Sequence, residues 1–338
     1  MPPPDSLIHA SSGALGGICA MAITYPLIVI STRAQVEAKQ AGESSLEAAI
    51  HLVRREGIAS FYDGLGSSLI GIAITNGIYY AFFEETRSIL LRSTQTGSKL
   101  PLRSSLTTLQ SMFAGAVAGS MTAVLTNPIW VVNTRQTVRI QQPTTTSSLN
   151  GAVMGSKLKS QRMGFLQTVL FILKTDGGLA FFRGLGPALV LVINPILQYT
   201  LFEQLKNILM ARRKLMLNSK PSNKSVQSVQ SGNVMSLGDL DFFLLGAISK
   251  LFATGATYPY LTVKSRMQSG QAEGRGYRGT YDGLSQIVKK DGVKGLYRGI
   301  APKLTQSVLT AAFLFLAKER IYHATKKALL TASRVTPI

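Results

Sequence analysis

Six segments of the chain are apolar and reach or approach the length of a membrane-spanning helix, which is about 20 residues. They run from 7 to 32, 65 to 83, 104 to 134, 185 to 202, 242 to 263 and 300 to 317. Polar stretches separate them, and none of the six contains an aspartate or a glutamate. The pattern predicts an all-α membrane protein with six transmembrane helices.

Composition agrees with this class, and the charges narrow the surroundings of the protein. The chain has 338 residues, of which 46% are hydrophobic, and its mean hydropathy is +0.20. Its net charge of +20 comes from lysines and arginines that lie mostly in the connecting segments. Such residues favour a place beside anionic lipid headgroups over one on a nucleic acid. The single cysteine, Cys19, excludes a disulfide framework within one chain, and three histidines offer little for a metal site.

One short pattern occurs three times along the chain. Each copy has a proline in an apolar window, an arginine seven residues later, and then an acid–glycine step followed by a second glycine. The members are Pro26, Arg33, Glu56, Gly57 and Gly64; Pro128, Arg135, Asp176, Gly177 and Gly184; and Pro259, Arg266, Asp291, Gly292 and Gly299. Because the copies stay in register, they predict three pseudo-symmetric helix-pair repeats.

The repeats are predicted at residues 1–98, 99–215 and 237–331, with a flexible linker at 216–236. The second repeat is longer than the first, and its extra residues fit polar stretches at 140–160 and in the linker, whose composition is typical of loops. We interpret the basic residues around 211–224 as solvated linker, and a targeting signal or a lipid-headgroup patch stays open as an alternative.

The proline-containing windows are also rich in glycine and alanine, which let helices pack closely in lipid. A proline inside a spanning helix removes one backbone hydrogen bond and kinks the helix. Three kinks at equivalent depth would bring three helices together at one point, and we predict a gate there. Short amphipathic helices are expected between the two members of each pair.

Taken together, the three proline–arginine copies and their acid–glycine partners resemble the mitochondrial carrier family over nearly the whole chain. Residues 127–135 (Asn-Pro-Ile-Trp-Val-Val-Asn-Thr-Arg), 192–195 and 303–312 are similar to the peroxisomal adenine nucleotide carriers of that family. They are also similar to the branch that moves NAD, FAD and coenzyme A.

The resemblance implies a transporter that exchanges cytosolic ATP for AMP or ADP across the peroxisomal membrane by alternating access. The alternatives are a carrier of NAD, FAD or coenzyme A, a membrane scaffold that has kept the fold and lost transport, and a location in the mitochondrial inner membrane. Expected partners are the nucleotide and membrane lipids, while import factors of the peroxisomal membrane stay open. No cofactor and no nucleic acid are expected. An enzyme would need a nucleophile or a general base at the site, and the apolar windows contain no carboxylate.

The resemblance also implies an inner gate at the repeat prolines and arginines, where family members carry ion pairs. Their acid stands two residues after the proline and their base five residues after it. Here the acid positions hold Ile28, Trp130 and Leu261, and the base positions hold Ser31, Asn133 and Lys264. Glutamines that brace this ring correspond to Gln35 and Gln268, with Thr137 in the second repeat. We therefore expect a weak inner gate held by apolar contacts and hydrogen bonds.

At the cytosolic gate, members of the family carry an acid followed by a base three residues later on each even helix. Glu84 with Arg87 and Glu203 with Lys206 match, whereas Glu319 is followed by Tyr322 and lacks the base. Exposed ion pairs are worth about 1 kcal/mol or less each. Two pairs instead of three should therefore bias which side opens more easily, without locking either side.

Two lysines, Lys250 and Lys303, lie inside apolar windows that contain no acid. A lysine at membrane depth usually faces a water-filled path or a partner, and unpaired cations around a cavity favour a phosphate-bearing cargo. The alternative for Lys303 is that its amine reaches the membrane interface. Lys264 belongs to the same third repeat. The three lysines together predict a lopsided site with a cationic pole on the fifth and sixth helices.

Alignment to the substrate-contact positions of the family adds further candidates for the binding site. The positions fall on Gly71 in the second helix, on Val190 or Leu191 in the fourth, and on Ser307 beside Gln306 in the sixth. Tyr79, Asn194 and Gln198 are expected to line the same cavity and to hydrogen-bond a base or a ribose. Helix packing is the alternative role for Gly71 and for these three residues.

Overall fold

The computed structural model describes residues 5–36, 45–95, 106–138, 163–218, 237–270 and 276–313. Within these ranges every regular element is helical. The long helices are α1 (Asp5–Val36), α3 (Leu65–Gln95), α4 (Thr108–Val138), α7 (Ile193–Asn218) and α9 (Asp239–Ser269), and the short helix α6 (Leu185–Val190) directly precedes α7. Residues 300–313, up to the last described position, are also helical.

Shorter helices join the two members of each pair, as the sequence predicts. They are α2 (Ser45–Glu56) with the 3-10 helix η1 (Ile58–Tyr62), α5 (Phe165–Thr175) with η2 (Gly178–Phe182), and α11 (Thr280–Leu296). In α11 the backbone of Gly292 leaves the helical region, with a φ of 68°, at the place where the other two repeats change from an α-helix to a 3-10 helix.

Five of the described segments are long and apolar enough to span a membrane: Gly16–Val36, Ile58–Ser93, Thr108–Val138, Gly178–Met216 and Leu240–Ser269. The sixth predicted window, 300–317, continues past residue 313, so residues 314–317 lie outside the described residues. The helices extend beyond the apolar windows because polar residues continue the same backbone hydrogen bonding at either end.

The side chains are arranged inside out compared with a soluble bundle. Phe113, Leu125 and Ile248 are exposed, whereas Thr126 and Thr257 on the same helices are buried. In a bilayer, lipid tails replace water around the bundle, so apolar side chains face outward while polar ones bond to one another inside. This arrangement follows from the membrane class that the sequence predicts.

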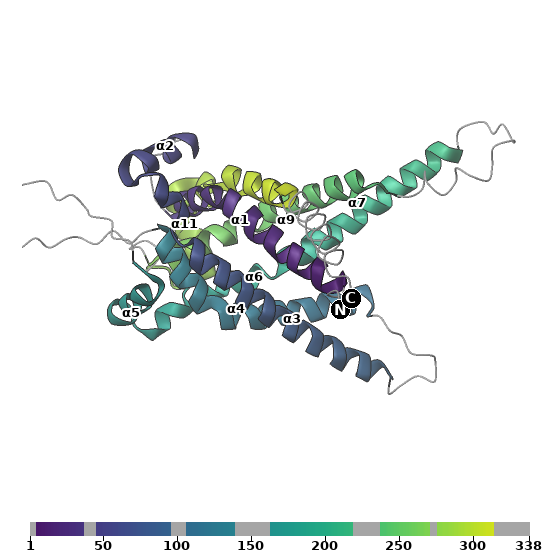
Figure 1. The fold of residues 1–338 in the computed structure, drawn as a ribbon, viewed down its shortest axis with the longest axis horizontal. Coiled ribbons are helices and arrows are strands. Elements are labelled where there is room, and N and C mark those ends of the chain that lie inside the picture. Colours follow the sequence, from purple (N-terminus) through teal and green to yellow (C-terminus); the bar gives the residue numbers. More distant parts are fainter. Residues whose placement is uncertain are drawn as a thin grey trace, which may run out of the picture.

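Figure 1 shows how the helices are placed along the bundle. The connecting helices α2, α5 and α11 gather at one end, whereas α3 and α7 run apart toward the opposite end. We call the first end the ring end, because Arg33, Arg135 and Arg266 lie there, and the second the far end. Each of these arginines lies in the last turn of its helix or close to it.

An ion pair explains why the proline–arginine and acid–glycine patterns occur together. Arg33 pairs with Glu56 at 2.9 Å, Arg135 with Asp176 at 2.7 Å, and Arg266 with Asp291 at 2.9 Å. In every repeat the pair fixes the end of the long odd helix to the connecting helix that follows. The side chains are largely buried, so removal of one partner would leave an uncompensated charge.

Candidate functional site

At the ring end, the three repeats are joined by a closed cycle of hydrogen bonds. The Nε of each arginine donates to the carbonyl of the residue two positions after the arginine of another repeat. Arg33 reaches Thr137 at 2.9 Å, Arg135 reaches Gln268 at 3.4 Å, and Arg266 reaches Gln35 at 2.9 Å. The cycle runs from the first repeat to the second, to the third, and back to the first, so it closes this end of the bundle.

The two glutamines add a second layer to this closure. The side-chain nitrogen of Gln35 donates to the Tyr258 hydroxyl at 2.9 Å, and the nitrogen of Gln268 donates to Asn127 Oδ1 at 3.1 Å. Thr137 stands at the equivalent place in the second repeat, but its hydroxyl donates to the carbonyl of Asn133 in its own helix, at 2.9 Å. The second layer is therefore made by two glutamines instead of three.

The positions five residues after each proline also differ among the repeats. Ser31 donates to the Gly299 carbonyl at 2.9 Å, and Asn133 donates to the Gly64 carbonyl at 3.0 Å and to Ser68 Oγ at 2.6 Å. Each of these bonds links an odd helix to the turn that starts an even helix of another repeat. No described hydrogen bond or ion pair is made by the amine of Lys264, the third member of this set.

Toward the far end, the predicted acid–base pairs form within single helices. Glu84 pairs with Arg87 at 2.7 Å in α3, and Glu203 pairs with Lys206 at 3.5 Å in α7. Neither pair joins two repeats, in contrast to the cycle at the ring end. Glu319, the predicted third acid of this gate, lies outside the described residues. Arg213 of the basic run donates to both carboxylate oxygens of Asp241 at 2.8 Å and so links α7 to α9.

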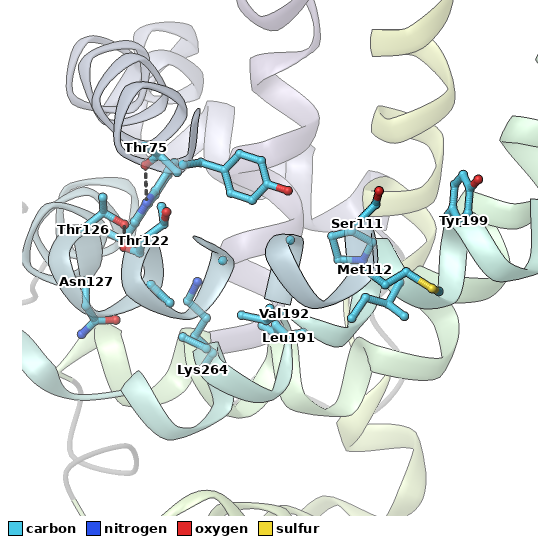
Figure 2. A pocket seen from close by; sticks show the side chains of 18 of the residues that line it. Thr75, Ser111, Met112, Thr122, Thr126, Asn127, Leu191, Val192, Tyr199 and Lys264 are labelled. Carbon is cyan, nitrogen blue, oxygen red and sulfur yellow. Dashed lines mark hydrogen bonds between the residues drawn. The ribbon is translucent and has the colours of Figure 1, made fainter. Parts of the chain in front are cut away.

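A cavity of about 610 Å³ lies between α3, α4 and α7. Figure 2 shows its wall from close by. Thr75 and Tyr79 of α3 line the cavity, together with Leu106, which precedes α4, and one side of α4 between Thr108 and Trp130. The rest of the lining comes from Ala188, Leu191, Val192, Pro195, Ile196 and Tyr199 around the junction of α6 and α7, and from Lys264 of α9. Its lining contains no aspartate and no glutamate, so Lys264 brings the one charged side chain of this wall.

One face of α4 supplies most of the wall. The lining residues Ser111, Gly115, Gly119, Thr122, Thr126 and Trp130 follow one another at spacings of three and four, which places them in a single stripe along the helix. Sequence reasoning treated the small residues as packing positions and Trp130 only as a departure from the family's acid. The regular spacing within the third apolar window was the signal that could have revealed this wall.

The fourth apolar window, expected at 185–202, lies within one segment long enough to span a membrane, Gly178–Met216, but its helix is interrupted by a short turn. The chain leaves α6 after Val190 and enters α7 at Ile193. Pro195 has no N–H to continue the helical ladder, and the carbonyl of Leu191 instead accepts from the Asn194 N–H at 3.0 Å, three residues on. The break turns Leu191 and Val192 toward the cavity (Figure 2).

Among the binding residues expected from sequence, Tyr79 and Leu191 line this cavity. Gly71 instead lies against α4, where an added Cβ would be 3.3 Å from Ile129 Cγ2, a position that fits the packing alternative. Asn194 donates to Thr257 Oγ1 of α9 at 2.7 Å, and Gln198 is half-buried outside the lining.

The remaining expected residues belong to the third repeat. Lys303 donates to Gln306 at 3.2 Å, Gln306 donates to Thr310 at 2.9 Å, and the Thr310 hydroxyl lies 2.8 Å from that of Thr24 in α1. The Ser307 hydroxyl is bonded to the Lys303 carbonyl at 3.0 Å. Lys250 is half-buried on α9. Lys250 and Lys264 are both close enough to Lys303 for their charges to interact, although Lys250 and Lys303 lie outside the lining of the cavity.

Comparison with known proteins assigns this architecture. The sequence matches the mitochondrial carrier protein family over residues 3–94, 104–213 and 240–329. The chain belongs to the mitochondrial carrier family. It is accordingly a membrane carrier and not an enzyme, and each matched segment contains one proline, arginine and acid–glycine set.

Three relatives of this carrier cover nearly its full length. It is 32% identical to the peroxisomal membrane protein PMP47B of Candida boidinii, over 98% of this chain and 90% of the relative. It is 34% identical to the peroxisomal nicotinamide adenine dinucleotide carrier of Arabidopsis thaliana, over 97% and 99%. It is 28% identical to the peroxisomal adenine nucleotide carrier 1 of Glycine max, over 98% and 95%.

Proposed function

We propose that this carrier exchanges adenine nucleotides, cytosolic ATP against internal AMP or ADP, across the peroxisomal membrane. The observation that carries the proposal is the cavity beside α4, whose lining has one cation, Lys264, and no acidic side chain. A lysine in a wall without counter-charges favours an anionic cargo, and phosphate oxygens accept several charge-assisted hydrogen bonds at once.

The rest of the wall suits the other end of a nucleotide. Tyr79, Trp130 and Tyr199 offer aromatic surfaces, and the remainder is formed mainly by small and aliphatic side chains. A site that is mostly apolar with a few placed polar groups is the usual composition of a small-molecule pocket, and a volume of about 610 Å³ lies within the usual range for such sites.

The arrangement of the two ends supports alternating access. The cycle of arginine bonds closes the ring end, whereas the acid–base pairs toward the far end stay within single helices. In this state the cavity is separated from the ring end, and exchange requires that the cycle open while the pairs of α3 and α7 change partners. Rearrangement of repeats about a central site is a general strategy of transporters.

Its relatives support the organelle and the class of cargo, and they also supply a second candidate. Among them are carriers named as peroxisomal, one for adenine nucleotides and one for nicotinamide adenine dinucleotide. AMP, ADP, ATP and NAD all contain an adenosine 5′-phosphate unit, which would place the same base and the same first phosphate in the cavity. NAD is the second candidate, because the chain is 34% identical to the dinucleotide carrier and 28% identical to the adenine nucleotide carrier.

An exchange panel tests the cargo. Purified protein in liposomes loaded in turn with AMP, ADP, ATP, NAD, FAD, coenzyme A or aspartate is supplied with external labelled ATP. We expect uptake against internal AMP, ADP and ATP, and none in liposomes without internal substrate. Faster uptake against NAD than against all three adenine nucleotides would select the second candidate. Absence of ATP uptake against every internal nucleotide would overturn the first candidate. If labelled external NAD is not taken up either, the second candidate also fails and a membrane scaffold remains.

Location is tested separately in cells. The full chain, carrying a fluorescent tag, is imaged together with a peroxisomal matrix marker and a mitochondrial inner-membrane marker. We expect a ring of signal around the peroxisomal marker. Coincidence with the mitochondrial marker instead would contradict the proposed organelle without affecting the cargo.

A further inference from the structure

Lys264 breaks the pattern that its two counterparts follow at the ring end. Ser31 and Asn133, five residues after their prolines, each bond to the carbonyl of a turn glycine in another repeat. The turn glycine beside Lys264 is Gly184, where an added Cβ would be 3.2 Å from the Lys264 carbonyl. The Lys264 carbonyl therefore lies against its turn glycine, as the Ser31 carbonyl lies against Gly299. No described bond joins the side-chain amine of Lys264 to that turn. Figure 2 shows the side chain rising from α9 between Thr122 and Leu191.

The neighbours of this amine offer it no anion. No carboxylate lines the cavity, and the other charges close to Lys264 include the amine of Lys303. Removal of an ammonium from water without a counter-charge or hydrogen-bond acceptors is strongly unfavourable. An anion that enters from the cavity would supply the counter-charge that the described surroundings of Lys264 lack.

Most other donors at the floor of the cavity are already engaged within the protein. The hydroxyls of Thr122 and Thr126 donate to carbonyls four residues earlier in α4, at 2.7 and 2.8 Å. The Asn127 amide donates to the Phe181 carbonyl, and the Trp130 indole donates to Thr75 Oγ1 at 3.2 Å. Since Thr75 accepts that bond, its own proton can still be donated. Lys264 and Thr75 are therefore the groups at this depth that can donate to a ligand.

We propose that the amine of Lys264, assisted by the Thr75 hydroxyl, is the innermost phosphate-binding group of this carrier. On this view Lys264 is a ligand of the cargo and not a member of a permanent ring of ion pairs. The phosphate would supply the negative charge that the junction between the second and third repeats lacks. The proposal rests on the proposed function for the identity of the cargo, but the anion site itself can be tested without transport.

The first test compares cargoes that differ in phosphate number. Inhibition of exchange by external AMP, ADP and ATP is measured for the wild type, for Lys264→Gln and for Lys264→Arg. Loss of a charge-assisted bond should weaken ATP inhibition roughly tenfold or more, AMP inhibition by less, and Lys264→Arg should recover most of the loss. Lys294→Gln, which removes an exposed lysine of the same repeat, is the matched control and should behave as the wild type.

The second test requires no transport. Unfolding temperature in detergent is measured with and without inorganic tripolyphosphate, a probe that carries the anion and no base. We expect stabilisation of the wild type and of Lys294→Gln, and a clearly smaller shift for Lys264→Gln. Equal shifts in all three proteins, or none in the wild type, would overturn the phosphate site.

The two tests separate the site from the cargo. A wild type that exchanges no adenine nucleotide but is stabilised through Lys264 would contradict the proposed function and keep the anion site. Normal exchange with the same order of AMP, ADP and ATP inhibition in Lys264→Gln would keep the function and overturn the site. If Lys264 only shapes the gate, Lys264→Gln would change the exchange rate equally for all three cargoes and leave the tripolyphosphate shift intact.

Discussion

At the scale of single residues, the three turn glycines at the starts of the even helices leave no room for a larger side chain. Gly64, Gly184 and Gly299 start the even helices with φ between 76° and 81°, a region that other residues adopt at a cost. Each also lies against an odd helix of another repeat, where an added Cβ would be 3.0 Å or less from a neighbouring atom. Both requirements act at the same positions, so glycine is needed there for conformation and for space.

Gly299→Ala should therefore destabilise the bundle by roughly 2 kcal/mol. Its Cβ would be 2.7 Å from the Ser31 carbonyl oxygen, which is backbone and cannot rotate away. Thermal unfolding in detergent measures the effect. Gly66→Ala is the control, because Gly66 lies in α3 with open space around its Cβ position, and it should leave the unfolding temperature unchanged or slightly higher. Equal effects of the two substitutions would contradict the contact.

At the scale of elements, the break between α6 and α7 decides the shape of the cavity. The turn at Leu191 and Val192 brings Val192 against α4 at Gly119, where an added Cβ would be 2.8 Å from Val192 Cγ1. Gly119 is also part of the stripe that lines the cavity. The absence of a side chain at Gly119 thus allows the broken helix to approach α4.

Gly119→Ala is expected to push the break away from α4 and to destabilise the protein by about 1–3 kcal/mol, the usual range for overpacking. The change should also slow nucleotide exchange in liposomes. Gly115→Ala, one turn earlier on the same stripe, is the matched control, because its Cβ would make an ordinary contact of 3.4 Å with the Tyr79 hydroxyl. Adding Val192→Ala to Gly119→Ala should restore stability, and failure to do so would show that this contact is not the cause.

At the scale of the whole molecule, the frame is threefold but its junctions are unequal. The hydrogen bonds of the three arginines join all three repeats in the same way. Ser31 links the first repeat to the third, and Asn133 links the second repeat to the first. Thr137 stands where the other two repeats have a glutamine, and it bonds within its own helix. The third junction has Lys264 and Trp130 at the floor of the cavity. A weak inner gate stays a prediction, although hydrogen bonds, as expected, take the place of acid–base pairs at two junctions.

Trp130→Asp tests this junction by supplying an internal carboxylate beside Lys264. We expect the new charge to compete with the cargo, so that ATP inhibits exchange less strongly and the exchange rate falls. Combined with Lys264→Gln, it should show a coupling energy for stability of roughly 1 kcal/mol or more in a double-mutant cycle. Trp130→Asn removes the indole without adding a charge and serves as the control. Additive effects of Trp130→Asp and Lys264→Gln would mean that the two positions do not interact.

Much of the scaffold follows from sequence because its causes are local or repeated. Apolar windows report membrane helices, since a bilayer requires a continuous apolar length. Positions such as Pro26, Arg33 and Glu56 recur in three copies, so each copy supports the others. Five predicted windows accordingly agree with described segments long enough to span a membrane, the fourth with a break between α6 and α7, and the described part of the sixth is helical.

The binding wall could be predicted only in part, because it depends on which helix faces turn toward one another. Lys250 and Lys303 stand out in sequence as charges in apolar windows, yet the described cavity is lined by Lys264. The sequence placed Lys264 in the inner gate and in the cationic pole, but it did not single out Lys264 as the member that reaches the cavity. Thr75 and the stripe on α4 carry no charge, and they gain significance only when α3, α4 and α7 enclose a space.

Sequence by itself determined the membrane class, the three repeats and the carrier family, because these follow from apolar length and from patterns repeated along one chain. It showed that the arginine and acid–glycine patterns occur together, but only the structure showed that they form ion pairs. Tertiary structure alone decided which donors remain available to a ligand. That property depends on bonds between distant segments, such as Trp130 to Thr75 and Asn127 to Gln268. It also depends on the break at Leu191, which sets where the wall of the cavity lies.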